Sequence, residues 1–168
     1  MKKQYASLQE RQNPVWTEDL LLHLKKYGWK EYGYECCNEY YNTEKDFLSC
    51  LEKQTRKLEM GLPQQFHTNG RYFDINYLGS TAGFVLLVPT YDPIYGEVLE
   101  LEVGVFDRYS KNKIASNALD IIIEQYSNNR LDAIIRSNNS NKDRIEGLLK
   151  QKGFQLDNED DTLWFYHS

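Results

Sequence analysis

Hydrophobic residues recur at helical spacing in two stretches of the N-terminal third. The first stretch follows Thr17 and the second follows Thr43, and either threonine can cap a helix through its side-chain oxygen. We expect Gly28 to end the first helix and Gly61 to end the second, because glycine favours the turn that closes a helix. A weaker alternation over residues 4–9 predicts a first strand.

From residue 71 onwards the hydrophobic repeat changes to the two-residue period of strands. Strands are predicted at 72–77 and 82–88, joined by a tight turn, and Pro89 is expected to end the second of them. Residues 90–96 are predicted to be a loop because they hold a proline and a glycine. The next strand is predicted over 97–105.

The last third of the chain alternates between the two repeats again. Its predicted elements are a helix over 114–123, a strand over 131–136, a helix over 141–152, and closing strands over 154–157 and 162–167. No internal repeat, linker or low-complexity segment interrupts this order. The sequence therefore predicts one mixed α/β domain that spans residues 1–168.

Charge and composition narrow the classes of partner. The chain of 168 residues has a net charge of −5 and an isoelectric point near 5.3. Nucleic acid binding is disfavoured because it needs a basic face. An amine-bearing partner suits an acidic protein better, although acidic proteins are common in any case. The longest apolar run, residues 84–88, is far below the roughly 20 residues of a membrane span, so no membrane association is expected.

Cysteine and histidine usage points to neither disulfides nor metal. The three cysteines are an odd number, and the N-terminus lacks the apolar core of a secretory leader, which together favour a cytoplasmic location. No CxxC motif and no histidine pair at ligand spacing occurs, so no metal site is expected. The three histidines are expected to be packing or surface residues.

Three stretches resemble the GCN5-related N-acetyltransferase (GNAT) family: Glu102–Leu119, Ile134–Asn141 and the Gly153-Phe154 pair. The resemblance covers about residues 70–157, and the N-terminal third follows it by order of elements only. It implies an α/β single domain with a mixed, mostly antiparallel twisted sheet flanked by about four helices. It also implies an N-acetyltransferase that moves the acetyl group of acetyl-coenzyme A to a primary amine of a small molecule or protein.

The family binds the pyrophosphate of coenzyme A with a loop of the form R/Q-x-x-G-x-G/A that opens a helix. Residues 110–115 align with this loop and match it only at the last position. The resemblance implies that the binding residues are Lys111, Asn112, Lys113, Ile114, Ala115 and Ser116. Lys113 replaces a glycine and is expected to take a helical φ angle, while Lys111 and Lys113 supply positive charge. The alternative is a loop that no longer binds coenzyme A.

The same resemblance assigns roles to the preceding strand and to a later turn. Backbone groups of Gly104, Val105 and Phe106 would bind the pantetheine arm, and one N–H would polarise the thioester carbonyl. The alternative is an ordinary strand of a sheet. Asn141 approximately matches the family's turn asparagine, and an asparagine is equally expected there as a helix cap.

Glu100 and Glu102 are candidates for accepting the proton of the amine. They lie two residues apart on a predicted strand, so their side chains share one face, and the alternating apolar residues of that strand face the other way. The alternative is a solvated end of the strand. Many family members place a tyrosine as a general acid where this chain has Leu149; Tyr109 and Tyr166 are other candidates.

The acceptor side is less well defined. The segment 29–41 is rich in tyrosine and glutamate, which suits an ammonium group, although an exposed loop packed through its tyrosines explains it as well. Transfer would be direct, because no cysteine lies near the predicted site. A catalytically impaired relative that binds acyl-coenzyme A or a protein partner is the main alternative. An enzyme acting on aminoacyl-tRNA is disfavoured by the charge, and a homodimer is left open.

Overall fold

A computed structural model describes residues 6–32, 41 and 43–167 of the chain. Seven strands form one sheet in the order β1-β2-β3-β4-β5-β7-β6. The strands are β1 (Ala6–Arg11), β2 (Arg71–Tyr77), β3 (Ser80–Asp92), β4 (Gly96–Val105), β5 (Arg130–Ile134), β6 (Gln155–Leu156) and β7 (Leu163–Tyr166). The helices are α1 (Glu18–His23), the π-helix η1 (Leu24–Tyr32), α2 (Glu44–Glu59), the short η3 (Asp107–Tyr109), α3 (Ile114–Tyr126) and α4 (Lys142–Gln151).

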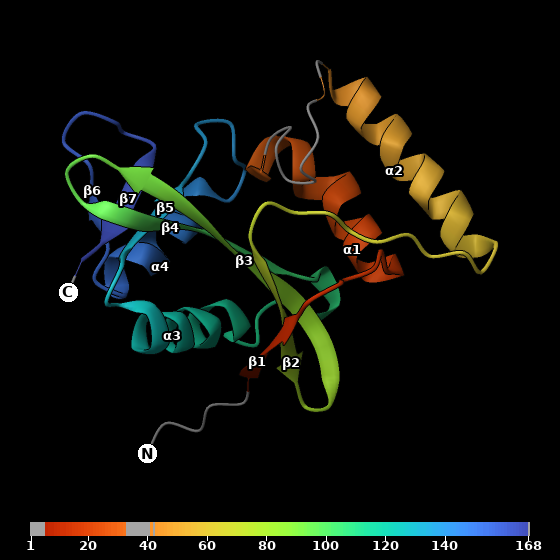
Figure 1. Ribbon diagram of the computed structural model, residues 1–168, viewed down its shortest axis with the longest axis horizontal. Helices are drawn as coiled ribbons and strands as arrows, with labels where there is room; N and C mark the ends of the chain where they lie inside the picture. Colours follow the sequence, from red (N-terminus) through yellow and green to blue (C-terminus); the bar gives the residue numbers. More distant parts are fainter. Residues whose placement is uncertain (1–5, 33–40, 42, 168) are drawn as a thin grey trace.

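Helices cover both faces of the sheet, and each face has its own hydrophobic cluster (Figure 1). Residues of α3 and α4 pack on one face around the fully buried Val85, Ile122 and Leu131. Residues of α1 and α2 pack on the other face, where Phe47 and Phe84 are fully buried. The apolar residues therefore specify a sheet with two covered faces, as the mixed α/β prediction requires.

Strands β4 and β5 are the one parallel pair in this sheet, and they part early. Val98–Glu100 pairs with Arg130–Asp132, after which β4 continues to Val105 with β3 as its one paired neighbour among the described strands. Each of the other neighbouring strands pairs antiparallel. The outgoing half of β4, the part that follows Glu100, thus has a backbone edge on the β5 side beyond the last β4–β5 pair.

Strand β3 is longer than predicted. Pro89 was expected to end it and residues 90–96 were expected to be a loop, yet the strand runs on to Asp92. The prediction was wrong because Pro89 lies where β3 has passed the end of β2, whose last pair is Arg71 with Leu87. In the β3–β4 register, the nitrogen of Pro89 points away from β4, so the missing N–H breaks no ladder hydrogen bond.

The first helix also extends beyond its predicted end. Gly28 was expected to terminate it, but the chain continues as the π-helix η1 to Tyr32. The side chain of Phe47 lies against Gly28, and a Cβ atom at Gly28 would be 2.7 Å from its Cζ atom. Gly28 is therefore a point of close approach between η1 and α2. The predicted caps at Thr17 and Thr43 are confirmed, since their hydroxyls accept hydrogen bonds from the N–H groups of Leu20 and Asp46.

Candidate active site

Helix α3 begins from a left-handed residue. Lys113 precedes the helix with φ 56° and ψ 25°, and Lys111 has φ 71°. The expectation that Lys113 takes a helical φ angle is therefore wrong, and this lysine keeps the conformation that a glycine adopts readily. Non-glycine residues in this region carry a steric cost of order 1 kcal/mol or more, which the surrounding structure must offset.

Hydrogen bonds and packing hold this loop in place. The side-chain amide of Asn112 donates to the carbonyl oxygens of Tyr109 and Ser110, and that of Asn117 donates to the carbonyl oxygen of Lys113. Ile114 anchors the first turn of α3 in the hydrophobic cluster. A left-handed residue before a helix aims backbone N–H groups at one point, which suits an anion.

The hydrogen bonding of the β4 backbone reduces the number of N–H groups that could contact pantetheine as expected. The N–H of Phe106 donates to the carbonyl oxygen of Ala82 at 2.9 Å, so it is not available to a ligand, contrary to expectation. In an antiparallel ladder the hydrogen-bonding direction alternates, so Gly104 also faces β3 whereas Val105 faces β5. Of the three predicted residues, Val105 is the one whose N–H points to the side where β4 and β5 part.

Glu100 and Glu102 lie on the same face of β4, as predicted, and both are half-buried. Their β3 partners in the register are Val88 and Leu86, and Leu86 belongs to the hydrophobic cluster on the α1 and α2 side. The Oε2 atom of Glu102 is shielded from solvent. Both carboxylates therefore face the α1 side of the sheet rather than bulk water at a strand end.

Sequence reasoning missed a third acid on this face. Asp132 of β5 is the register partner of Glu100, and side chains of directly paired residues point to the same face of a sheet. Its carboxylate Oδ1 is 2.7 Å from the Nε atom of Arg130. The alternation of polar and apolar residues over 130–136 could have identified it. The two strands thus part at a point flanked by Glu100 and Asp132.

The turn before α4 is organised by Asn139 rather than by Asn141. The buried Asn139 accepts a hydrogen bond from the N–H of Asn141 through its Oδ1 atom at 2.8 Å. Asn141 occupies the cap position of α4, but its side chain makes no capping hydrogen bond there. The helix-cap interpretation of the Asn141 side chain is therefore wrong, and its binding role stays a prediction.

The three positions considered for a general acid differ in their surroundings. Leu149 is buried in the hydrophobic cluster beneath α4. Tyr166 packs against Gly153 and against the ring of Phe154 at a centroid distance of 5.6 Å. Tyr109, next to the end of β4, is half-buried and contacts both hydrophobic clusters.

His23 is a packing residue, as predicted. It is 6% exposed and its ring lies 5.0 to 5.9 Å from the rings of Tyr27, Phe84 and Phe106. Burial lowers the pKa of His23 to about 4, and the nearby charge of Asp107 offsets only part of this effect. The imidazole is therefore neutral near pH 7.

Part of the predicted acceptor segment, residues 33–40 and 42, lies outside the described residues. The two aromatic residues at its ends pack on Phe47, with ring centroids 6.0 Å away for Trp29 and 5.5 Å away for Tyr41. The carbonyl oxygen of Trp29 accepts a hydrogen bond from Nη1 of Arg136, just after β5, at 3.4 Å. Helix η1 therefore reaches the strand that parts from β4.

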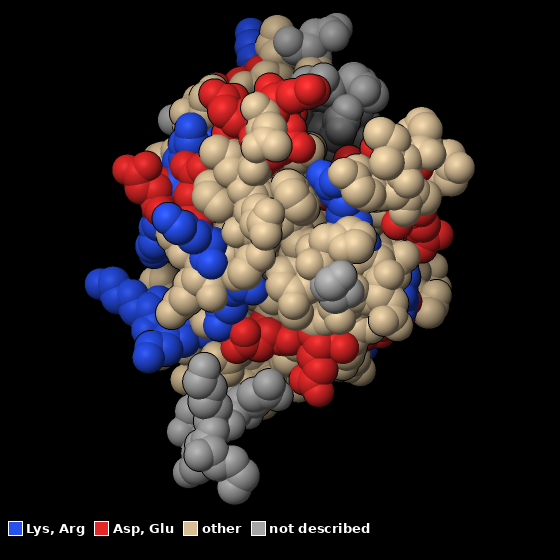
Figure 2. All heavy atoms as spheres, turned by 90° about the vertical axis from the view of Figure 1, so that its left-hand side faces the viewer, with Lys and Arg blue, Asp and Glu red and all other residues tan. Residues whose placement is uncertain are grey.

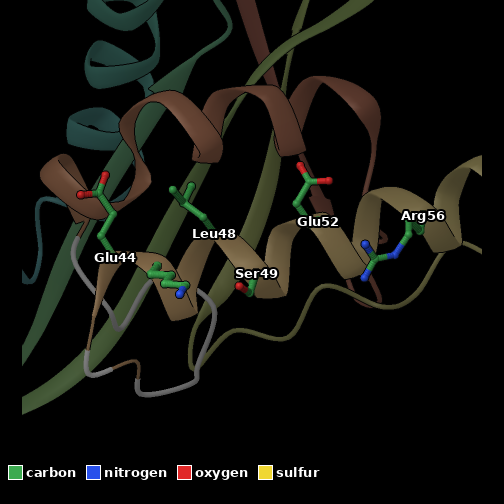
Figure 3. A pocket seen from close by; sticks show the side chains of 6 residues that line it. Glu44, Leu48, Ser49, Glu52 and Arg56 are labelled. Carbon is green, nitrogen blue, oxygen red and sulfur yellow. The ribbon is translucent and has the colours of Figure 1, made fainter.

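An open groove of about 590 Å³ runs along α2, away from the predicted site residues (Figure 3). Its lining residues are Glu44, Lys45, Leu48, Ser49, Glu52 and Arg56. Glu44, Leu48 and Glu52 point towards the neighbouring helix, and Glu52 pairs with Lys25 at 3.0 Å. The Glu52–Lys25 ion pair joins α2 to η1, and no predicted site residue lines this groove.

The surface charges and the described side chains are relevant to nucleic acid binding, metal binding and membrane insertion. One face of the molecule shows small separate groups of acidic and basic residues around an uncharged centre, not a continuous basic surface (Figure 2). Among the described residues, no cluster of three histidine, cysteine or acidic side chains could hold a metal ion. Within the same residues, no helix has the length and apolar character needed to cross a bilayer.

Comparison of the sequence with protein-family models finds no match, and comparison with curated proteins finds none either. Solved structures do match the fold. One is the Bacillus subtilis N-acetyltransferase YlbP in complex with coenzyme A, with 11% identity, 97% of each chain covered and a TM-score of 0.54.

Two further structures are similar to a comparable degree. Spermidine N-acetyltransferase from Vibrio cholerae, in complex with coenzyme A and spermine, has 11% identity, a TM-score of 0.53, and 97% of this chain and 93% of that chain covered. Aminoglycoside N(6')-acetyltransferase from Legionella pneumophila has 8% identity, a TM-score of 0.53, and 98% and 91% covered. The chain therefore has the GNAT fold, which confirms the predicted fold class.

Proposed function

We propose that this protein is an N-acetyltransferase that transfers the acetyl group of acetyl-coenzyme A directly to a primary amine. The observation that carries this proposal is the left-handed Lys113, which lies between β4 and α3 and directly precedes the helix. A left-handed residue before a helix directs backbone N–H groups at one point, which suits an anion, and Lys111 and Lys113 supply positive charge there. The GNAT fold, shared with acetyltransferases whose structures hold coenzyme A, supports the same activity.

In this proposal the pyrophosphate binds the backbone of residues 111–116, with the charges of Lys111 and Lys113 close by. The thioester lies along the outgoing half of β4. The N–H of Val105 would polarise its carbonyl, because that N–H faces β5. A neutral hydrogen-bond donor at this position stabilises the negative charge that develops on the carbonyl oxygen.

The acceptor amine would approach from the α1 side, where Glu100 and Glu102 lie. Its nitrogen attacks the thioester carbon, a C–N bond forms, and the C–S bond breaks to release the thiolate of coenzyme A. Glu102 or Glu100 accepts the proton of the amine, directly or through water. The thiolate needs little help from an acid because a thiol pKa is about 8.5, which is compatible with the buried Leu149.

The acceptor class follows from charge. Glu100 and Glu102 share one face of β4, so this side favours a cationic acceptor, an ammonium-bearing small molecule or an amino group of a protein. Asp132 lies on the same face, but Arg130 offsets its charge. Similar structures include enzymes named for spermidine and aminoglycosides, both amine-rich. A cytoplasmic location and a homodimer stay predictions from the sequence.

A catalytically impaired protein that binds acyl-coenzyme A or a protein partner is the second candidate. The observation that favours it is Leu149, which is buried where many members of the family have a tyrosine that acts as a general acid. In this alternative the donor loop would bind as proposed and no acceptor would be turned over.

Calorimetric titration with acetyl-coenzyme A tests the donor site. We expect binding in the micromolar range for the wild-type protein and a loss of about tenfold or more in Lys113→Glu, because the reversed charge repels the phosphates. Lys53→Glu, an exposed lysine in the middle of α2, is the matched control and should bind like the wild type. No binding at millimolar acetyl-coenzyme A would refute the proposal.

A further inference from the structure

Asp107 joins the donor side of the candidate site to the acceptor side. It is the second residue after Val105 and begins η3, which connects β4 to the loop before α3. Its Oδ1 atom accepts a hydrogen bond from the hydroxyl of Tyr27 at 2.6 Å, and its Oδ2 atom lies 2.7 Å from Nζ of Lys26. One carboxylate therefore holds two neighbouring residues of η1.

Two more contacts fix the same helix pair. Arg108, the next residue of η3, forms an ion pair with Asp19 of α1. At the far end of η1, the carbonyl oxygen of Trp29 accepts from Arg136. The α1–η1 segment is thus attached at the end of β4 and again beyond the end of β5. It spans the two strands on the side that carries Glu100 and Glu102.

The link at Asp107 contributes little to global stability. The side chains of Lys26 and Asp107 are 62% and 54% exposed, and exposed ion pairs typically contribute at most about 1 kcal/mol. The attachment of α1 to the sheet rests instead on Leu20, Leu21 and Leu24, which are buried against it. A link with so small an effect on folding can still fix where η1 lies, because it selects one position of a helix that is already docked.

We propose that Asp107 is a positioning residue that sets η1 over the acceptor side of the site. The inference rests on the proposed acetyltransferase activity, because the acceptor side is defined by it. Tyr27 and Lys26 are the groups through which Asp107 acts. Loss of the carboxylate lets η1 shift away from Glu100 and Glu102, while the donor loop, which Asn112 and Ile114 hold independently, keeps its shape.

The test compares wild-type protein with Asp107→Ala and with Asp107→Glu as a conservative rescue. Glu10→Gln is the matched control, because Glu10 is also a carboxylate in an exposed ion pair, with Arg71, at the far edge of the sheet. Hydrogen–deuterium exchange is followed in peptides covering 24–32. Acetyl-coenzyme A affinity is measured by calorimetry, and kcat and KM are measured with the best of three probe acceptors: spermidine, an aminoglycoside and a peptide with a free N-terminus.

For Asp107→Ala we expect exchange in 24–32 to become about fivefold faster, which corresponds to an opening free energy lower by about 1 kcal/mol. Exchange in α3 should stay as in the wild type. The acceptor KM should rise by a similar factor, with acetyl-coenzyme A affinity unchanged within about twofold. Asp107→Glu should recover most of both effects, and Glu10→Gln should show neither.

Equal exchange in Asp107→Ala and Glu10→Gln would overturn the inference, and so would a loss of donor affinity as large as the rise in KM. The proposed activity fails by a different result, the absence of acetyl-coenzyme A binding in the wild-type protein. Faster exchange confined to 24–32 together with a raised acceptor KM supports a positioning role. Faster exchange throughout the protein indicates general destabilisation and contradicts it.

Discussion

At the scale of single residues, Lys113 combines a left-handed backbone with a positive charge. The sequence predicted its place in the loop and its charge, but not its φ angle, because a lysine on its own favours the right-handed region. The conformation is imposed by neighbours, among them the buried Ile114 and the hydrogen bond from Asn117 to the Lys113 carbonyl. Similarly, the alternation over 130–136 could have placed Asp132 on a polar face, but its pairing with Glu100 is what brings it to the candidate site.

Glu102→Gln should lower kcat by about 100-fold if Glu102 accepts the proton of the amine. The deficit should shrink as the pH rises towards about 10, where a lysine-like amine loses its proton to water without help. Glu100→Gln, two residues away on the same face, is the matched comparison. The variant with the larger loss of kcat identifies the base, and unchanged kcat in both variants would contradict a carboxylate base on β4.

At the scale of elements, the predicted starts of the first two helices and the predicted end of α2 at Gly61, which has φ 75°, are confirmed, whereas the predicted end at Gly28 is wrong. Thr17 and Thr43 cap their helices through contacts within one turn, so local residues suffice. Gly28 instead serves a contact with Phe47, nineteen positions along the chain, and therefore did not act as a terminator. Contacts distant in sequence overrode a local signal that was typical of a helix end.

Gly28→Ala should destabilise the protein by about 1 to 3 kcal/mol, because the new methyl group would press on the fully buried Phe47 ring. Gly147→Ala in α4 is the matched control. Nothing lies within 4 Å of a Cβ atom there, so alanine should stabilise the helix by about 0.5 to 1 kcal/mol. Chemical denaturation measures both changes, and destabilisation of equal size in the two variants would refute the close-contact explanation.

At the scale of the whole molecule, two hydrophobic clusters on opposite faces hold one sheet, and the candidate site lies where that sheet divides. The order of elements predicted a mixed α/β domain, and the resemblance to the GNAT family implied the mostly antiparallel sheet flanked by about four helices. The point of division depends on how far β4 and β5 pair, which is over three residue pairs. No local sequence pattern encodes the length of that pairing. The sequence thus located the strands of the site but not the point at which they part.

The pH dependence of global stability should reflect His23. Its pKa is lowered by burial to about 4 in the folded protein and is about 6.5 in the unfolded chain. Between these values the unfolded chain binds more protons, so stability is complete above about pH 6.5 and falls as the pH drops towards 4. Because the imidazole is protonated more readily in the unfolded chain, the free energy of unfolding should fall by up to about 3 kcal/mol over this range.

His23→Phe removes the titrating group and keeps a ring among Tyr27, Phe84 and Phe106. Urea denaturation at about pH 5 and about pH 7 should show a smaller loss of stability in the variant than in the wild type. Equal losses would mean that carboxylates alone govern the acid sensitivity.

The position of Pro89 has a consequence for how this protein behaves in a crowded solution. Beyond Leu87, strand β3 pairs with no described strand on its β2 side, and such an open edge can recruit a strand from another molecule. The backbone nitrogen of the exposed Pro89 points in that direction, and because proline has no N–H it donates no hydrogen bond to an added strand. Pro89, which does not end the strand, therefore makes its edge less able to pair with a strand of another molecule and so disfavours aggregation.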